Sequence, residues 1–190
     1  VRSQYDVLYG HWPESYDEVV LVVSQNDEIS DLVMYAMGLK TEAEMNAAMQ
    51  DAMDEKEVST EAMSWTYEEL CDHTFKLILP WENYRRDAQG GYTDLSLTEA
   101  GMDYLYGSDD VGTTLKISGI VRPNPDAAAT MLSGSIGYTG ALSEDVMQQT
   151  AESEIVRAQL DDPDTDVLTA LPFKTDDTEE PTEEEKDAAL

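Results

Sequence analysis

The sequence predicts an α+β fold in which helices pack on a mixed sheet. Two β-branched apolar runs, residues 18–23 and 115–121, predict strands, and the first of them is expected to be buried on both faces. Segments with helix-capping residues and helical spacing of apolar side chains lie between and after these runs. The order strand, helices, strand, strand, helices is typical of an α+β protein.

The first helix is predicted shortly after the strand at 18–23, which a turn-like segment at 10–13 precedes. Ser30 is suited to cap a helix over residues 31–37, because its hydroxyl can accept from a free backbone N–H of the first turn. Gly38 stands where a residue in the left-handed conformation ends many helices.

A second helix begins with a capping box formed by Thr41 and Glu44 and is predicted to run to about Lys56. Its apolar residues recur at helical spacing. They are Met45, Ala48, Met49, Ala52 and Met53.

A short third helix is predicted from a second capping box, Thr66 with Glu69. Trp65 and Leu70 occupy the two positions of a hydrophobic staple around its first turn. Residues 75–79 then begin with an apolar–polar–apolar alternation, continue with two further apolar residues before Pro80, and predict a strand.

The second half of the chain is less regular. Residues 81–110 are rich in turn-forming residues and are expected to contain a hairpin or a loop excursion. After the strand at 115–121, residues 133–139 predict a shorter extended segment. Ser143 is the predicted cap of a helix to about Gln149, and a further helical stretch is expected over 152–160.

The chain is strongly acidic, with 41 Asp and Glu against 11 Lys and Arg in 190 residues and a net charge of −30. Its hydrophobic content of 41% is sufficient for one domain with its own core. Residues 175–190 carry a charge of −7 and predict a solvated tail or linker. The folded part, residues 1–174, still carries −23.

This charge limits the expected partners. A surface so negative repels phosphates, which excludes nucleic acid and anionic lipid headgroups. Cationic peptides, metal ions and a high-salt environment stay open as explanations of the charge. If the chain has a ligand surface, that surface is expected to favour cations, for example a cationic peptide.

The longest apolar run, residues 19–23, is too short to span a membrane, and no signal peptide precedes it. The start at Val1 suggests a piece of a longer protein. The single cysteine, Cys71, excludes an internal disulfide and a multi-cysteine zinc site.

The sequence does not match the catalytic motifs tested. The pattern Gly-x-x-x-x-Gly-Lys-Ser/Thr of P-loop ATPases does not occur in the sequence. Residues 133–137 resemble the Gly-x-Ser-x-Gly turn around a nucleophilic serine, here Ser135, but Ser133 occupies the place of the first glycine. Ser135 is therefore expected in a turn or an edge strand.

The other reactive side chains have structural interpretations. His11, beside Trp12, is expected to lie at the surface or to pack. His73 lies at the end of the third helix, where a cation suits the negative helix terminus. Cys71, on the same helix, is expected to be a small buried hydrophobe, because nothing nearby would lower its pKa.

Residues 162–166 have the Asp-x-Asp-x-Asp start of a calcium-binding loop. Val167 replaces the glycine of the sixth position and Phe173 the glutamate of the twelfth, so an exposed acidic turn is the prediction. We expect no catalytic, cofactor-binding or metal-binding residues in this chain, and no enzymatic activity of its own.

A series of segments stands in a familiar order. They are residues 5–13, 17–23, 29–39, 66–70, 75–77, 115–123, 136–139, 155–159 and 166–173. Together they resemble the external domain of the large FtsX-like, MacB-like ABC transporter permeases of Gram-positive bacteria, over nearly the whole folded part. The sequence departs from that family at His11, where arginine is commoner, and at Ala170, where glycine is usual.

The resemblance implies a fold similar to the MacB periplasmic core, with a mixed-sheet subdomain and a variable subdomain inserted within residues 40–110. Residues 1–174 would be the extracellular domain, and residues 175–190 a linker toward a membrane helix. The domain would lie on the outer face of the cell membrane, between two spanning helices of its own permease.

The partners implied are those transmembrane helices and a separate ATP-binding subunit or domain that hydrolyses ATP. The domain itself would bind or gate a substrate, or transmit ATP-driven motion to an external cell-envelope partner.

Two other classes of function stay open. A free-standing secreted or surface-anchored binding module would have a signal peptide and an anchor in its gene, without several spanning helices. A hydrolase would need a placed pair of carboxylates, and among 41 acidic residues the sequence identifies no pair.

Overall fold

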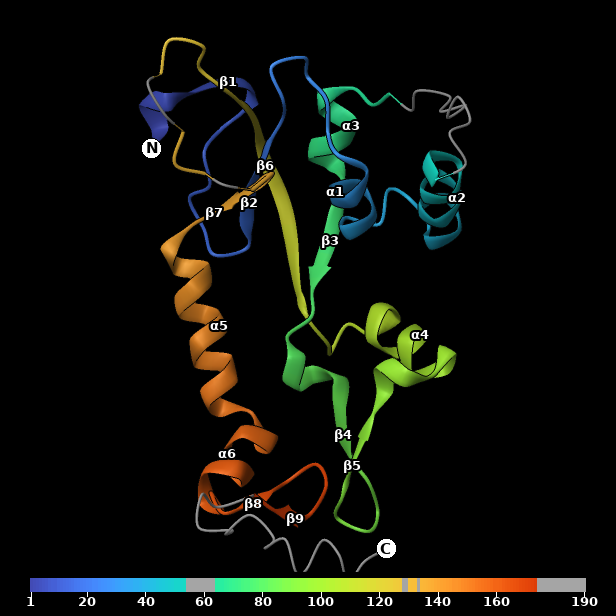
Figure 1. Ribbon diagram of the computed structural model, residues 1–190. Helices are drawn as coiled ribbons and strands as arrows, with labels where there is room; N and C mark the ends of the chain where they lie inside the picture. The colour runs from blue at the N-terminus through green and yellow to red at the C-terminus, as the bar shows by residue number, and fades with distance from the viewer. Residues whose placement is uncertain (54–63, 128–129, 133, 174–190) are drawn as a thin grey trace, which may run out of the picture.

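The structure is a computed structural model, which describes residues 1–53, 64–127, 130–132 and 134–173. It confirms the predicted α+β fold with a mixed sheet. The main sheet has the strand order β1-β6-β2-β7, and β3 also pairs with β6 (Figure 1). These strands are β1 (Tyr5–Gly10), β2 (Glu18–Val22), β3 (Thr74–Leu77), β6 (Thr113–Pro123) and β7 (Ile136–Tyr138).

Strand β6 is the centre of this sheet. It is 11 residues long, so β3 pairs antiparallel with its first part, at 113–116, and β1 pairs antiparallel with its last part, at 119–123. Strand β2 runs parallel to β6 and carries β7 antiparallel on its other side. As predicted, β2 is buried on both faces, with Val19, Val20 and Leu21 each only 1% exposed.

One residue of β6 interrupts the pairing with β2. Val19 lies opposite Ile117 and Val20 opposite Gly119, so Ser118 is an extra, bulged residue. Its hydroxyl donates to the backbone carbonyl oxygens of His11, at 3.1 Å, and Val19, at 3.2 Å. The bulge is therefore held in place by hydrogen bonds of its own side chain.

The sheet separates two groups of buried side chains. The larger cluster contains alternate residues of β2 together with Leu115, Ile117 and Ile120 of β6, and helices α1, α3 and α5 cover it. The smaller cluster, on the other face, is built on Tyr5, Val20 and Val121.

The helices that cover the larger cluster begin as predicted. In α1 (Asp31–Ala36), the Ser30 side chain accepts from the Val33 N–H. In α3 (Tyr67–Asp72), both hydrogen bonds of the Thr66–Glu69 capping box are present.

Helix α2 (Glu42–Met53) also has its capping box, since Thr41 N–H donates to Glu44 and Glu44 N–H donates to Thr41. Met53 at its end is exposed. The side chains of Met45, Ala48, Met49 and Ala52, and the predicted end of the helix at residues 54–56, lie outside the described part of the chain.

Residues 80–107 form a side lobe next to the sheet (Figure 1). After a short 3₁₀ turn (Pro80–Asn83), a hairpin of β4 (Tyr84–Arg86) and β5 (Tyr92–Asp94) matches the expected excursion. Helix α4 (Glu99–Gly107) follows a second 3₁₀ turn (Leu95–Leu97) and was not predicted. Thus within the range predicted as an insertion, residues 40–110, β3 belongs to the main sheet and α3 packs on it, whereas α2 and the side lobe lie away from it.

The predicted start of the next helix is wrong. Helix α5 (Gly140–Glu152) is capped by Thr139, whose hydroxyl accepts from the Leu142 N–H at 3.4 Å, and Ser143 lies inside the first turn. The reason is the end of β7 at Tyr138, which leaves Thr139 in the extended conformation that an N-cap requires.

The described part of the chain ends with helix α6 (Glu154–Asp161) and a small hairpin of β8 (Thr165–Asp166) and β9 (Leu171–Pro172). This end lies at the opposite pole of the molecule from Val1 (Figure 1). The predicted acidic tail, residues 175–190, lies outside the described residues. Over the described ranges, no helix combines the length and the apolarity that crossing a bilayer requires.

We expect Gly119→Ala to lower the free energy of unfolding by about 3 kcal/mol, because a Cβ atom there has no space. It would overlap the backbone carbonyl of His11 and lie 2.9 Å from the His11 nitrogen. Urea denaturation measures the change. Gly140→Ala is the matched control, since a Cβ at the start of α5 meets nothing within 4 Å. Equal stability of the two variants would contradict the close approach of β1 to β6.

We expect Ala170→Gly to raise stability by up to about 1 kcal/mol, because Ala170 has a φ of 56° that glycine adopts without strain. The control is Ala158→Gly within α6, which should lower stability by a similar amount. Both are measured by thermal unfolding of the 190-residue chain. A loss of stability in both variants would show that residue 170 does not hold the left-handed conformation.

Candidate functional site

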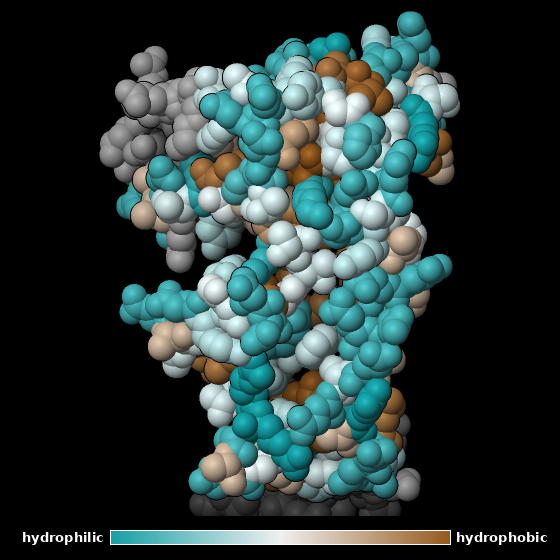
Figure 2. All heavy atoms as spheres, turned by 180° about the vertical axis from the view of Figure 1, so that it is seen from behind, coloured by the Kyte–Doolittle hydropathy of each residue, from teal (hydrophilic) through white to brown (hydrophobic). Residues whose placement is uncertain are grey.

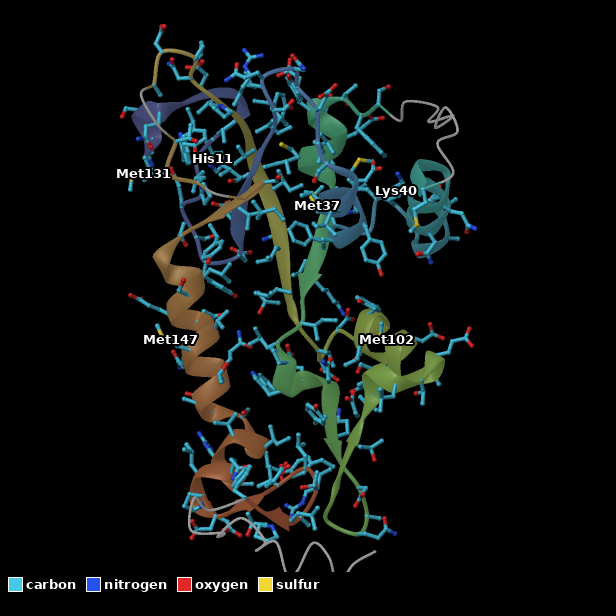
Figure 3. The ribbon with its side chains drawn as sticks, in the orientation of Figure 1. His11, Met37, Lys40, Met102, Met131 and Met147 are labelled. Atoms are coloured by element: carbon cyan, nitrogen blue, oxygen red, sulfur yellow. The ribbon has the colours of Figure 1, made fainter. Side chains whose placement is uncertain are left out.

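A large cleft lies between the sheet and the side lobe. It has a volume of about 690 Å³, and we call it the α1–α4 cleft. Its lining comes from the end of α1 and the connection to α2, from β3 with the preceding His73, from α4 and from the start of β6: Tyr35, Ala36, Met37, Gly38, Lys40, Thr41, His73, Thr74, Phe75, Lys76, Met102, Tyr106 and Thr114. Figure 2 shows a hollow in the surface at the position of the cleft. Figure 3 places Met37 above the cleft and Met102 below it.

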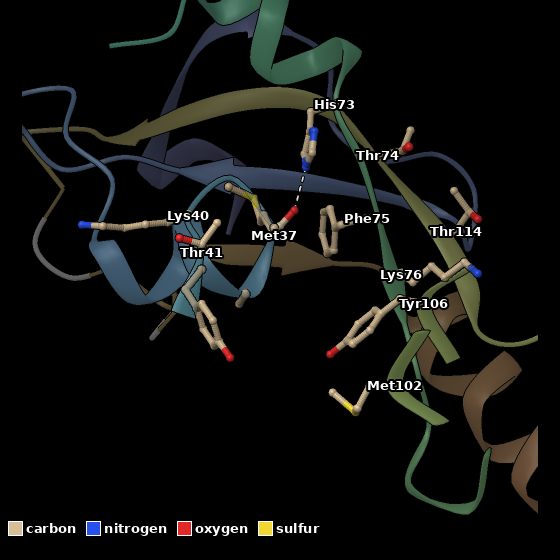
Figure 4. A pocket seen from close by; sticks show the side chains of 13 residues that line it. Met37, Lys40, Thr41, His73, Thr74, Phe75, Lys76, Met102, Tyr106 and Thr114 are labelled. Atoms are coloured by element: carbon tan, nitrogen blue, oxygen red, sulfur yellow. Dashed lines mark hydrogen bonds between the residues drawn. The ribbon is translucent and has the colours of Figure 1, made fainter. Parts of the chain in front are cut away.

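Aromatic and thioether side chains dominate the close view of the cleft. Tyr106 and Met102 reach in from α4, Met37 faces them from the end of α1, and Phe75 of β3 lies between them (Figure 4). Tyr106 is 62% exposed, so most of its surface is open to solvent.

The ammonium groups of the two lysines that line the cleft bind residues outside the lining. Lys40 is 8% exposed, and its Nζ lies 3.0 Å from Asp31 Oδ2. The ammonium of Lys76 donates to the backbone carbonyl of Ser108. Figure 4 shows both side chains extending away from Phe75.

His73 has a structural hydrogen bond within this site. Its Nε2 lies 2.7 Å from the carbonyl oxygen of Met37, which requires the tautomer with the proton on Nε2. His73 is the C-cap residue of α3, as predicted, but its ring binds the C-cap residue of α1, Met37, where the sequence predicted an interaction with the end of its own helix.

His11, the other histidine, is exposed, and its Nδ1 lies 2.9 Å from the carbonyl oxygen of the adjacent Trp12.

Cys71 lies half-buried on α3, against the larger core cluster. Burial raises the pKa of its thiol above the usual value, and the neighbouring Asp72 carboxylate adds to the rise. The environment therefore favours the thiol over the nucleophilic thiolate.

Ser135 lies in a bend directly before β7, and its backbone carbonyl accepts from the Val22 N–H at 2.7 Å. This agrees with the predicted turn or edge strand. Ser133, the residue that breaks the nucleophile pattern, lies outside the described residues.

In the acidic turn at 162–166, one carboxylate and two backbone carbonyls accept hydrogen bonds from nearby residues. Asp166 accepts from Leu168 N–H at 2.9 Å and from the Thr169 hydroxyl at 2.8 Å, and these bonds lower the pKa of its carboxyl group. The Gln159 side chain donates to the carbonyls of Asp162 and Thr165. Among the side chains that the structure describes, no three His, Cys, Asp or Glu are placed to share a metal ion.

A second cavity lies between α5 and the sheet. It has a volume of about 500 Å³ and is lined mainly by aliphatic side chains such as Leu77, Leu115, Leu142 and Val146. Leu115 and Leu142 belong to the larger core cluster, so this groove is a partly open edge of the hydrophobic core.

Sequence reasoning did not identify the α1–α4 cleft. Its aromatic residues come from three segments that no motif connects. The one available signal was Thr98, which precedes Glu99–Gly107 and accepts from the Gly101 N–H as the N-cap of α4.

We expect the Cys71 thiol to react with a disulfide reagent about tenfold more slowly in the folded protein than in urea at pH 8, because burial raises its pKa. A matched control is the exposed position 89, studied as Gln89→Cys in a Cys71→Ala background. Reaction of Cys71 as fast as the cysteine introduced at position 89 would contradict its burial.

Comparison with known proteins identified no matching family model, no similar curated protein and no similar solved structure.

Proposed function

We propose that this chain is the extracellular domain of an FtsX-like, MacB-like ABC transporter permease and has no enzymatic activity of its own. It binds or gates a substrate, or transmits ATP-driven motion to an external partner. ATP is hydrolysed by a separate subunit or domain. A cationic peptide or a basic envelope protein suits the net charge of −30 best as a partner.

The proposal rests on the positions of the family-like segments in the fold. All five strands of the main sheet overlap these segments: β1, β2, β3, β6 and β7. Segments separated by up to 118 residues in sequence, such as Tyr5 and Pro123, pair directly. Of the parts outside the family-like series, α2 and the side lobe lie at the periphery (Figure 1), whereas α5 packs on the larger core cluster. A common core with variable additions is the arrangement expected of divergent members of one family.

The chemistry of the described side chains supports a non-enzymatic role. His73, Asp166 and Lys76, which are reactive types, are each hydrogen-bonded to backbone groups that they hold in position. Cys71 has a raised pKa, which disfavours nucleophilic catalysis.

The test uses the full-length gene, expressed with its neighbouring ATP-binding subunit. We expect spanning segments on both sides of residues 1–190 and copurification of the ATP-binding subunit with the membrane fraction. A membrane-impermeant maleimide should label a Gln89→Cys, Cys71→Ala variant on intact cells, because position 89 is exposed at the tip of the β4–β5 hairpin.

A cysteine in the ATP-binding subunit is the control and should be labelled only after lysis. A gene that encodes no spanning segment would overturn the proposal. A signal peptide with a single anchor would favour the free-standing binding module.

A further inference from the structure

The α1–α4 cleft runs along the outer edge of β3. Thr74, Phe75 and Lys76 are consecutive, and all three line it. Successive residues of a strand point to opposite faces of the sheet, so a cavity that contacts all three must pass around the strand edge. The cleft thus brings together a sheet edge, the end of α1 and the side lobe.

The cleft offers no counter-charge to an ionic ligand. Of the described residues that line it, not one is acidic, although the chain has 41 Asp and Glu. The ammonium of Lys40 pairs with Asp31, and that of Lys76 binds the Ser108 carbonyl. A cation therefore has no carboxylate partner here, and an anion is repelled by the net charge of −30. The charges in and around the cleft therefore favour a neutral ligand.

An added peptide strand is also disfavoured. Strand β3 has only four residues, and Lys76 in its middle extends past the edge to Ser108. Short length and a lysine are both features that protect sheet edges against further pairing.

What the cleft does present is exposed rings on one side of β3 and, around the edge of that strand, exposed hydroxyl groups. Tyr35 is 43% and Tyr106 62% exposed, and they lie on α1 and α4, with Phe75 of β3 between these elements. The side chains of Thr74 and Thr114 are exposed on the strand side of the same cleft. A sugar ring has this dual character, because its C–H faces pack on aromatic rings while its hydroxyls require hydrogen-bond partners.

We propose that the α1–α4 cleft binds a neutral oligosaccharide, stacked on Tyr35 and Tyr106 and hydrogen-bonded by Thr74 and Thr114. The volume of about 690 Å³ lies within the ordinary range of ligand pockets, roughly 300–1,000 Å³. The proposal depends on the cleft alone and holds whether or not the chain belongs to a permease.

The test is an amide NMR titration of the 190-residue chain with three neutral probes, namely the tetramer of N-acetylglucosamine, cellotetraose and maltotetraose. At least one probe should shift the amides of residues 74–76 and 102–106, with a dissociation constant on the order of a millimolar. Because the ligand is uncharged, the affinity should not change between low and high salt.

Tyr106→Ala and Tyr35→Ala should each weaken binding about tenfold, since each removes a stacking surface. Both residues are exposed, so the variants should fold, which circular dichroism checks. Tyr106→Phe should retain binding, because it keeps the ring. Tyr16→Ala, at a tyrosine that is 47% exposed outside the cleft, is the matched control and should not change the affinity.

The proposal is overturned if none of the three probes shifts these amides, or if Tyr16→Ala weakens binding as much as Tyr106→Ala. It is also overturned if the saccharides fail and a strand-forming Thr-Val repeat peptide shifts residues 74–77, because the cleft would then be a site for an added strand.

Discussion

The bulge at Ser118 determines which side chains of β6 enter which core. Strict alternation from Ile117 would place Ile120 on the opposite face of the sheet. The extra residue reverses the alternation, so Ile120 joins Ile117 in the larger cluster and Val121 enters the smaller one. A bulge leaves backbone groups without ladder partners, and here the Ser118 hydroxyl donates to two neighbouring carbonyls. The β1–β6 contact at Gly119 depends on the same local geometry.

The length of β6 explains why the molecule has a cleft. Its upper part is covered on one edge by β1, and its lower part on the same edge by the much shorter β3. Beyond β3 the sheet stops, and the chain continues into the side lobe before it returns to begin β6. The α1–α4 cleft occupies the position that another strand would take in a wider sheet. The cleft is therefore a consequence of how the sheet ends.

Local sequence rules predicted the parts of the fold that local interactions determine. The strand at 18–23 and the capping boxes at Thr41 and Thr66 are examples, because burial pattern and cap geometry each involve only a few neighbouring residues. Helix α4 was missed because Gly101 lowers helix propensity. Only glycine fits at this position, since a Cβ atom would overlap the backbone of Leu95 in the preceding 3₁₀ turn. The cap of α5 was misplaced because Thr139 and Ser143 are both good caps, and the choice depends on where β7 ends.

The candidate site was beyond prediction for a different reason. Tyr35, Phe75 and Tyr106 lie on three elements that only the completed fold brings together. None of the three belongs to a spacing pattern that signals binding. Cys71, a reactive residue that the sequence did single out, packs against the larger core cluster as expected.

The strand directions have a mechanical consequence. Strands β1 and β7 run the same way, because β1 is antiparallel to β6, β6 is parallel to β2, and β2 is antiparallel to β7. The chain enters β1 from the pole of Val1 and leaves β7 through α5 toward the opposite pole (Figure 1). Tension between the two poles therefore pulls these outer strands along their axes in opposite senses. The cross-strand hydrogen bonds of the antiparallel ladders lie perpendicular to that pull, so the bonds of a ladder bear the load together in shear and do not open one after another.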